Sequence, residues 1–113
     1  MTPLTKVYLL DKAGQRFFGD GPCRLFRLVE QTGSLRAAAE EMGMAYTKAM
    51  KLIKQAEDAV GQPVTERVIG GAGGGGSRLT AAGKELVEKY EQYKAQCVAA
   101  NQGIYSQIFG GDG

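Results

Sequence analysis

The stretch 33–57, which reads GSLRAAAEEMGMAYTKAMKLIKQAE, constrains the fold of this chain more than any other. It predicts two short helices joined by a tight turn. The first helix, 35–42, follows Ser34, whose hydroxyl can accept a backbone N–H that is left unpaired at a helix start. Gly43 readily adopts the backbone conformation that ends a helix. The alanines at 37–39 are small enough to let another helix approach closely.

The second predicted helix begins at Ala45 or Tyr46 and ends at Val60. Its apolar residues recur at i, i+3, i+4, i+7 and i+11, which places them on one face of an α-helix. The other face is basic and carries a hydroxyl group, as a helix that enters a DNA major groove requires. The apolar face comprises Ala49, Leu52, Ile53, Ala56 and Val60, and the other face comprises Thr47, Lys48, Lys51, Lys54 and Gln55, with Tyr46 and Met50 beside it.

Length and composition exclude several classes of protein. A chain of 113 residues has room for one domain with one modest core. It contains no histidine, which removes imidazole acid–base catalysis, Ser-His and Cys-His nucleophile pairs and most zinc sites. Its two cysteines, Cys23 and Cys97, are too few for a disulfide scaffold and lack metal-ligand spacing. We therefore expect neither an enzyme nor a metal or cofactor site.

The apolar runs of the chain are far too short to span a bilayer, and no charged-then-apolar leader opens it. We expect no membrane association and a cytoplasmic location. The net charge of +2 says little about partners. Its distribution says more, because Lys48, Lys51 and Lys54 lie between Glu41 and Glu57 with no other acid in that interval.

Residues before the two-helix stretch predict a small hairpin and another helix. The hairpin occupies 4–20, with strands at 6–11 and 16–18, and the helix occupies 23–32. The apolar stripe of this helix is wider than a narrow core contact needs, so part of it is expected to face a second subunit. The expected interface residues here are Leu25, Phe26 and Val29.

Residues 62–79 predict a second hairpin, with strands at 63–69 and 77–79 around a glycine-rich tip at 70–76. A β-hairpin directly after the second helix of a helix-turn-helix is a wing. A wing can lie against the DNA backbone or in the minor groove.

Thr80 is expected to cap a long last helix over 80–108, and 109–113 is expected to form a flexible tail. Apolar residues along this helix alternate at +4 and +3, an average period of about 3.5 that is typical of a coiled-coil seam. We therefore expect the helix to pair with its copy in a second chain. The seam comprises Leu86, Tyr90, Tyr93, Cys97, Ala100 and Ile104, and its expected interface residues are Leu86, Tyr90, Tyr93 and Cys97.

These elements together predict one domain over 1–113, mainly α-helical with small β-hairpins. Its architecture is a winged helix-turn-helix with a long C-terminal dimerisation helix, in which the helix-turn-helix and the helix before it occupy 21–61.

From about Leu4 to Cys97 the chain resembles the DNA-binding domain of the ModE family, the molybdate-responsive bacterial regulators, and more distantly the winged helix-turn-helix of LysR-type regulators. The glycine-rich wing followed by Leu-Thr-x-x-Gly is the most specific part. The resemblance implies a homodimer that binds double-stranded DNA at a palindromic operator, with the first helix and the long last helix in the interface. The matching segments are Gly33-Ser34-Leu35, Ala37-Ala38-Ala39, Gly43-Met44, Tyr46-Thr47-Lys48-Ala49, Glu66-Arg67, Gly70-Gly71, Gly73 to Gly76 and Leu79-Thr80-Ala81-Ala82-Gly83.

The chain departs from that family at three positions. Ala45 stands where the family usually has serine, Met50 where it usually has tryptophan, and Ala72 where it often has a basic wing-tip residue. ModE regulators also carry a C-terminal pair of oxyanion-binding domains that nothing in these 113 residues matches. We therefore expect a link to molybdate-related gene control at most, without molybdate binding in the ModE manner.

Ten residues are the expected DNA contacts, and several have an alternative role. The lysines could form a solvated helix face, and Arg36 could be a surface residue without a DNA contact. Tyr46 could pack against Met50 and the hairpin, and Arg67 could pair with Glu66 or a neighbouring acid. For the whole chain the alternative is a protein-interaction or dimerisation module with little DNA binding. For Cys23 the alternative role is a redox sensor whose thiol has a lowered pKa. The expected contacts are Arg36, Ala45, Tyr46, Thr47, Lys48, Met50, Lys51, Lys54, Arg67 and Arg78.

Overall fold

A computed structural model describes residues 1–69 and 76–110. Most of the expected glycine tip of the wing, 70–75, and most of the expected flexible tail, 111–113, lie outside the described residues. In chain order the elements are β1 (Leu9–Leu10), β2 (Arg16–Phe18), α1 (Asp20–Thr32), α2 (Leu35–Glu41), α3 (Tyr46–Val60), β3 (Thr65–Val68), β4 (Gly76–Leu79) and α4 (Ala81–Phe109).

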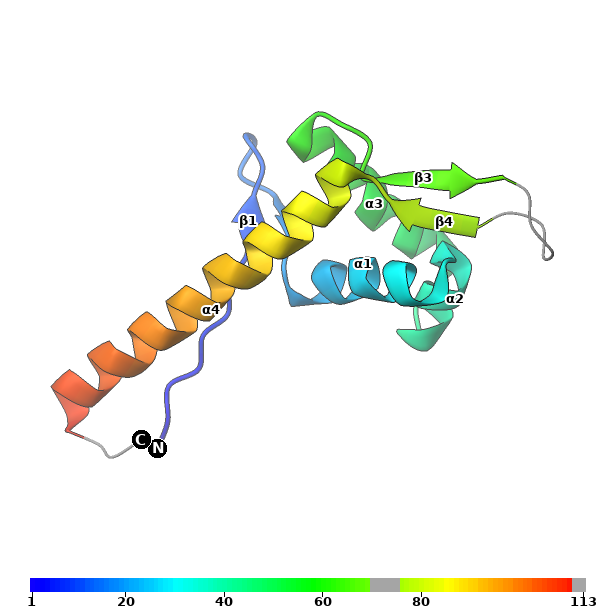
Figure 1. Ribbon diagram of the computed structural model, residues 1–113. Coiled ribbons are helices and arrows are strands. Elements are labelled where there is room, and N and C mark those ends of the chain that lie inside the picture. Colours follow the sequence, from blue (N-terminus) through cyan, green and yellow to red (C-terminus); the bar gives the residue numbers. More distant parts are fainter. Residues whose placement is uncertain (70–75, 111–113) are drawn as a thin grey trace.

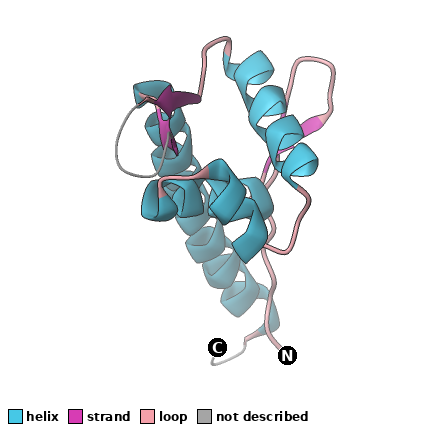
Figure 2. Ribbon diagram, turned by 90° about the vertical axis from the view of Figure 1, so that its right-hand side faces the viewer, coloured by secondary structure: helices cyan, strands magenta, loops and turns pink. Residues whose placement is uncertain are grey.

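The described elements form a small helical body from which α4 and the β3–β4 hairpin project in different directions (Figure 1). The two strand pairs lie on opposite sides of the helices (Figure 2). The long axis of the molecule, 58 Å against 30 and 24 Å for the other two, follows the projecting α4. The fold-class prediction is confirmed: the described residues are mainly helical, with two small hairpins, a helix-turn-helix and a long last helix.

Side-chain caps and one glycine set the helix boundaries of the two-helix unit and of α4. The Ser34 hydroxyl accepts the backbone N–H of Ala37 at 3.0 Å, and the Thr80 hydroxyl accepts that of Gly83 at 3.1 Å. Gly43, at a φ of +67°, turns the chain between α2 and α3, in a region of backbone space that a Cβ disfavours. Both predicted caps are therefore confirmed.

The hydrophobic core lies where α1, α2, α3, the wing and the first half of α4 meet. At its centre the Phe18 ring packs edge-on against Phe26 and against Tyr90, with ring centroids 5.2 Å apart in each pair. The Tyr90 hydroxyl donates a hydrogen bond to the Val7 carbonyl at 2.8 Å, so the chain before β1 is held against α4. The largest fully buried side chains are Phe18, Phe26, Leu25, Val29, Val64 and Val87.

Burial in the single chain corrects part of the expected dimer interface. Leu25, Phe26 and Val29 have no exposed surface, and Tyr90 is 2% exposed. Their side chains are enclosed by other elements of the same chain, so they have no surface to offer a second subunit. The apolar stripe of α1 is wide because this helix packs against several elements of its own chain, namely α2, α4 and the wing.

The N-terminal hairpin is shorter than the sequence suggests. Only Leu9 and Leu10 pair with β2, and the register shifts between them. The Asp11 carboxylate then closes the turn by accepting the backbone N–H of Ala13 and of Gln15, each at 2.9 Å. The remainder of the predicted strand over 6–11 is extended chain outside the β1–β2 ladder.

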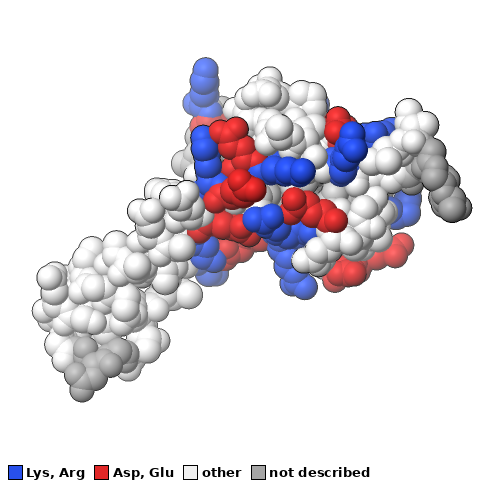
Figure 3. All heavy atoms as spheres, in the orientation of Figure 1, with Lys and Arg blue, Asp and Glu red and all other residues white. Residues whose placement is uncertain are grey.

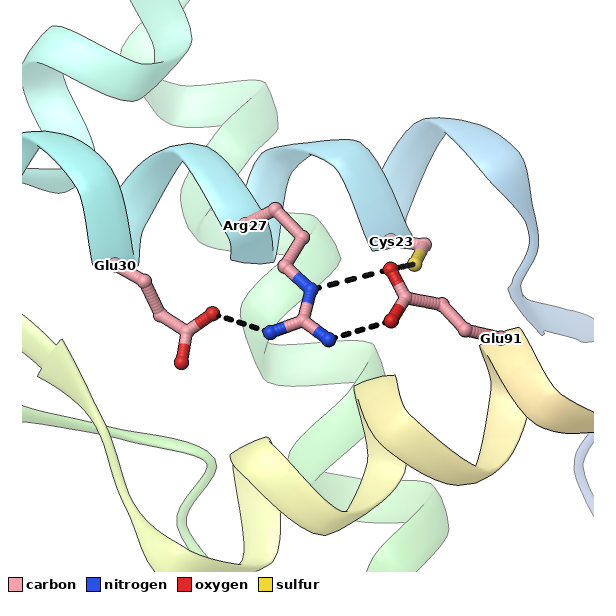
Figure 4. Close-up of polar contacts among 4 residues, drawn as sticks. All are labelled: Cys23, Arg27, Glu30 and Glu91. Carbon is pink, nitrogen blue, oxygen red and sulfur yellow. Dashed lines mark hydrogen bonds and ion pairs between the residues drawn. The ribbon is translucent and has the colours of Figure 1, made fainter.

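Arg27 links α1 to α4 (Figure 4). Its guanidinium donates to both carboxylate oxygens of Glu91, at 2.5 and 3.1 Å, and to Glu30 at 2.7 Å. The Cys23 thiol donates to the same Glu91 carboxylate at 3.7 Å. Burial, together with the nearby Glu91 charge, raises the pKa of Cys23 to about 11. The thiol is therefore protonated at neutral pH, which corrects the alternative that Cys23 is a low-pKa redox sensor.

The Arg27–Glu91 pair predicts a pH-dependent stability difference. The hydrogen bonds from Arg27 hold the pKa of Glu91 below its ordinary value. A carboxylate of this kind stabilises the fold above the unfolded-state pKa of about 4.3, and its contribution disappears as the pH falls through the lower folded-state pKa. We expect Glu91→Gln to lower the free energy of unfolding by about 0.5–1 kcal/mol at neutral pH, because the pair is partly exposed and screened.

Urea unfolding across the acid range measures this difference. It should vanish at pH values below the folded-state pKa, where wild-type Glu91 is itself protonated. The control is Glu88→Gln, which changes an exposed carboxylate on the same helix and should shift stability little. A Glu91→Gln penalty that persists undiminished in acid would contradict the ion-pair explanation.

Candidate nucleic-acid interface

The outer face of α3 carries the hydroxyl group and the lysines that the sequence predicts. Thr47, Lys48, Lys51 and Lys54 are all exposed, while the opposite face buries Ala49, Ile53 and Ala56 in the core. Of these lysines, Lys54 pairs with Asp58 at 3.1 Å, one turn later in the helix. The positive charge of α3 is therefore least compensated towards its N-terminal end.

The N-terminal end of α3 has no side-chain cap. Ala45 occupies the capping position in an extended conformation, and its side chain makes no capping hydrogen bond. The first backbone N–H groups of a helix lack intrahelical partners. The Lys48 N–H donates to the Ala45 carbonyl at 3.0 Å, so those of Tyr46 and Thr47 are left for water or for an anionic ligand such as a phosphate, which the helix dipole also favours.

Arg36 of α2 lies over the ring of Tyr46, with the guanidinium carbon 4.1 Å from the ring centroid. Such a cation–π contact contributes about 0.5–1 kcal/mol at an exposed site. Tyr46 is half-buried and Arg36 is exposed, so the ring supports the guanidinium beside the first turn of α3. The tyrosine therefore has a partner that the sequence alternatives did not include.

The wing is a four-residue antiparallel ladder in which Thr65 pairs with Leu79 and Val68 with Gly76. Across it, Arg78 donates to the Glu66 carboxylate at 2.7 Å. Glu66 thus pairs with Arg78 and not with Arg67, the partner considered from the sequence. Because the Arg78 charge is partly neutralised, exposed Arg67 is the better placed of the two to meet a phosphate.

The wing is anchored to the turn that precedes α2. The Ser77 backbone N–H donates to the Gly33 carbonyl at 2.8 Å. A Cβ on Gly76 would lie 2.3 Å from that carbonyl oxygen, so only glycine permits the approach. The wing is therefore held next to the start of the helix-turn-helix.

A groove of about 400 Å³ separates α3 from the wing. Glu57 connects its two walls, since its carboxylate accepts the Val64 backbone N–H at 3.0 Å just before β3 begins. Besides Glu57, the groove is lined by Leu35, Tyr46, Met50, Ile53, Lys54, Thr65, Glu66, Arg67 and Ser77.

The structure thus brings most of the expected DNA contacts to one end of the molecule, at α3 and the start of α2, with Arg67 and Arg78 on the adjacent wing. It also adds two exposed apolar wing residues that sequence reasoning missed, Val68 and Ile69. Their position directly before the glycine run was the signal that could have marked them as the end of the first wing strand.

The charged side chains gather on the body of the molecule. On the face shown in Figure 3, Lys and Arg lie among Asp and Glu over the body, whereas the projecting half of α4 is uncharged. Lys94 is the last charged residue of α4. Among the described residues, no group of three His, Cys, Asp or Glu side chains could hold a metal ion. Within the same residues, no helix is both long enough and apolar enough to cross a membrane.

Residues 23–84 match the family of bacterial regulatory helix-turn-helix proteins described as the lysR family, a family of transcription regulators and not of enzymes. This match runs from α1 through the wing into the first turn of α4.

Individual relatives agree with the family match. The molybdenum transport protein ModE of Herbaspirillum seropedicae is 36% identical over 88 residues, which are 78% of this chain and 31% of that protein. The molybdenum-pterin-binding protein MopB of Rhodobacter capsulatus is 33% identical, over 77% of this chain and 32% of its own length. The DNA-binding transcriptional dual regulator ModE of Escherichia coli (strain K12) is 32% identical, over 76% of this chain and 33% of its own length. The chain therefore spans about a third of the length of the relatives it matches.

Proposed function

Because the chain belongs to the lysR family of bacterial regulatory helix-turn-helix proteins, we propose that it is a homodimeric transcriptional regulator that binds a palindromic DNA operator. The observation that carries the proposal is the exposed, basic first half of α3, flanked by Arg36 and by the wing. In this arrangement α3 of each subunit enters a major groove, and the wing lies against the neighbouring backbone. Two half-sites one or two helical turns apart, on the order of 34 Å per turn, match a two-fold dimer.

Dimerisation is proposed to use the projecting half of α4. Along the predicted seam, Tyr93 just before this half is 54% exposed and Ile104 within it is 55% exposed. Ile108, one turn after Ile104 on the same face, is also exposed. Because residues 95–110 carry no charged side chain, two copies can meet there without like-charge repulsion. Exposed apolar surface of this extent favours a protein partner.

Cys97 connects Tyr93 and Ile104 along the seam, and Leu86 extends the surface towards the body of the molecule. Cys97 is partly buried, and Leu86 and Tyr93 line a groove of about 470 Å³ between α4, β1 and the end of α3. The revised interface therefore keeps Leu86, Tyr93 and Cys97 from the sequence prediction and replaces the buried residues by Ile104 and Ile108.

This interface predicts that Ile104→Asp weakens self-association by at least about tenfold, because it places a charge in a desolvated apolar seam. Sedimentation equilibrium over a concentration series measures the dissociation constant. The matched control is Ala99→Asp, which introduces the same charge at an exposed site on the opposite side of α4. A wild-type chain that stays monomeric, or equal effects of the two substitutions, would count against the seam.

DNA binding is tested by incubating the wild-type protein with sheared genomic fragments, sequencing the retained DNA and measuring its affinity by fluorescence anisotropy. We expect one enriched palindromic motif and an affinity that falls steeply with salt. Since two of the relatives are named for molybdenum transport or molybdenum-pterin binding, we propose that the retained fragments include genes for molybdenum handling. No retention even at low salt would reject the proposal in favour of a protein-interaction module.

A further inference from the structure

Met50 is a half-exposed apolar side chain on an otherwise basic helix face. It is 50% exposed, and it lies one turn after Tyr46 on the side of α3 that borders the wing groove. The Tyr46 ring is covered by the Arg36 guanidinium.

The first two turns of α3, residues 46–53, contain no arginine, asparagine, glutamine, aspartate or glutamate. Asparagine and glutamine read adenine through paired hydrogen bonds, aspartate and glutamate accept from the cytosine amino group, and arginine shares with lysine the ability to donate to guanine. The polar groups that remain are the Thr47 hydroxyl and the ammonium groups of Lys48 and Lys51. The lysines can donate to guanine O6 and N7, but the segment has no amide or carboxylate that could accept from the amino group of adenine or cytosine.

The major groove has one apolar feature on its base edges, the C5-methyl group of thymine. An apolar side chain that enters the groove removes water most favourably against that methyl group. A methionine suits the contact because its unbranched, flexible thioether chain can adapt to a methyl group at slightly different positions.

We propose that Met50 selects thymine in each operator half-site by packing against its C5-methyl group. The proposal rests on the proposed function, since it requires α3 to lie in the major groove. It assigns Met50 the preference for thymine, whereas the lysines contact phosphate or guanine.

The test replaces single thymidines of the selected operator by deoxyuridine, which removes only the C5-methyl group and keeps base pairing. For the wild-type protein we expect at least one symmetric pair of positions at which each replacement weakens binding about fourfold. This factor corresponds to the free energy of burying one methyl group. The Met50→Ala variant should bind the thymidine operator and its deoxyuridine counterpart with equal affinity. Met50→Leu, which keeps an apolar side chain of similar size, should retain the difference, and circular dichroism verifies that both variants are folded.

Wild-type binding that no deoxyuridine replacement weakens would overturn the role of Met50 while leaving DNA binding by the domain intact. A methyl effect of unchanged size in Met50→Ala would also overturn it, since another residue would then make the contact. Failure of the wild-type protein to bind any DNA would instead reject the proposed function.

Discussion

Replacing Gly83 by alanine is expected to destabilise the domain by about 3 kcal/mol, the upper part of the usual range for overpacking. A Cβ at this position would lie 2.2 Å from the Val64 carbonyl oxygen and 3.1 Å from its carbon. That oxygen cannot retreat freely, because it accepts the Thr80 backbone N–H at 3.0 Å and Val64 is fully buried. The close approach of the first turn of α4 to the start of the wing therefore depends on glycine.

Gly103 provides a matched control on the same helix. A Cβ there would meet nothing within 4 Å. Alanine should stabilise α4 by about 0.5–1 kcal/mol, since glycine loses more backbone entropy in a helix interior. Urea unfolding of the two variants, followed by circular dichroism, should give shifts of opposite sign. If Gly83→Ala proved as stable as the wild type, α4 would not pack on Val64 as described.

Removing both Lys48 and Lys51 is expected to weaken binding to the selected operator by about 10–100-fold at physiological salt. Both ammonium groups lie on the exposed N-terminal half of α3, where described acidic side chains compensate them least. Each lysine that neutralises a phosphate releases about one counterion. The slope of log Kd against log salt should therefore fall by about 2 in the Lys48→Ala, Lys51→Ala double variant.

Fluorescence anisotropy across a salt series measures both quantities. The matched control is Lys12→Ala, which removes an exposed lysine near the opposite end of α3, beside Asp58 to Gly61. It should leave affinity and slope nearly unchanged. Binding that survives the double substitution would exclude α3 as the DNA-contacting helix.

Local signals in the sequence were sufficient for much of this fold. The caps at Ser34 and Thr80 and the turn at Gly43 involve residues only a few positions away, so they follow from side-chain chemistry and backbone geometry. The apolar face of α3 also followed from its spacing, because a helix with one buried face repeats that pattern.

Contacts between distant residues could not be predicted in the same way. The period of an apolar seam does not reveal whether the same chain or a second chain buries it. Tyr90 packs in the core of its own chain, whereas Ile104, on the same seam, is exposed. Nor does spacing reveal that Arg27 meets Glu91, or that Arg36 covers Tyr46. These pairings depend on how the helices pack together, which local propensity does not determine.

The account depends most on α3 entering the major groove in two symmetric copies, and methylation interference tests that claim most directly. Dimethyl sulfate methylates guanine N7, which is an acceptor on the major-groove edge. We predict that N7 methylation blocks binding at two clusters of positions separated by one or two helical turns. Binding that tolerates N7 methylation throughout the selected operator would contradict the account.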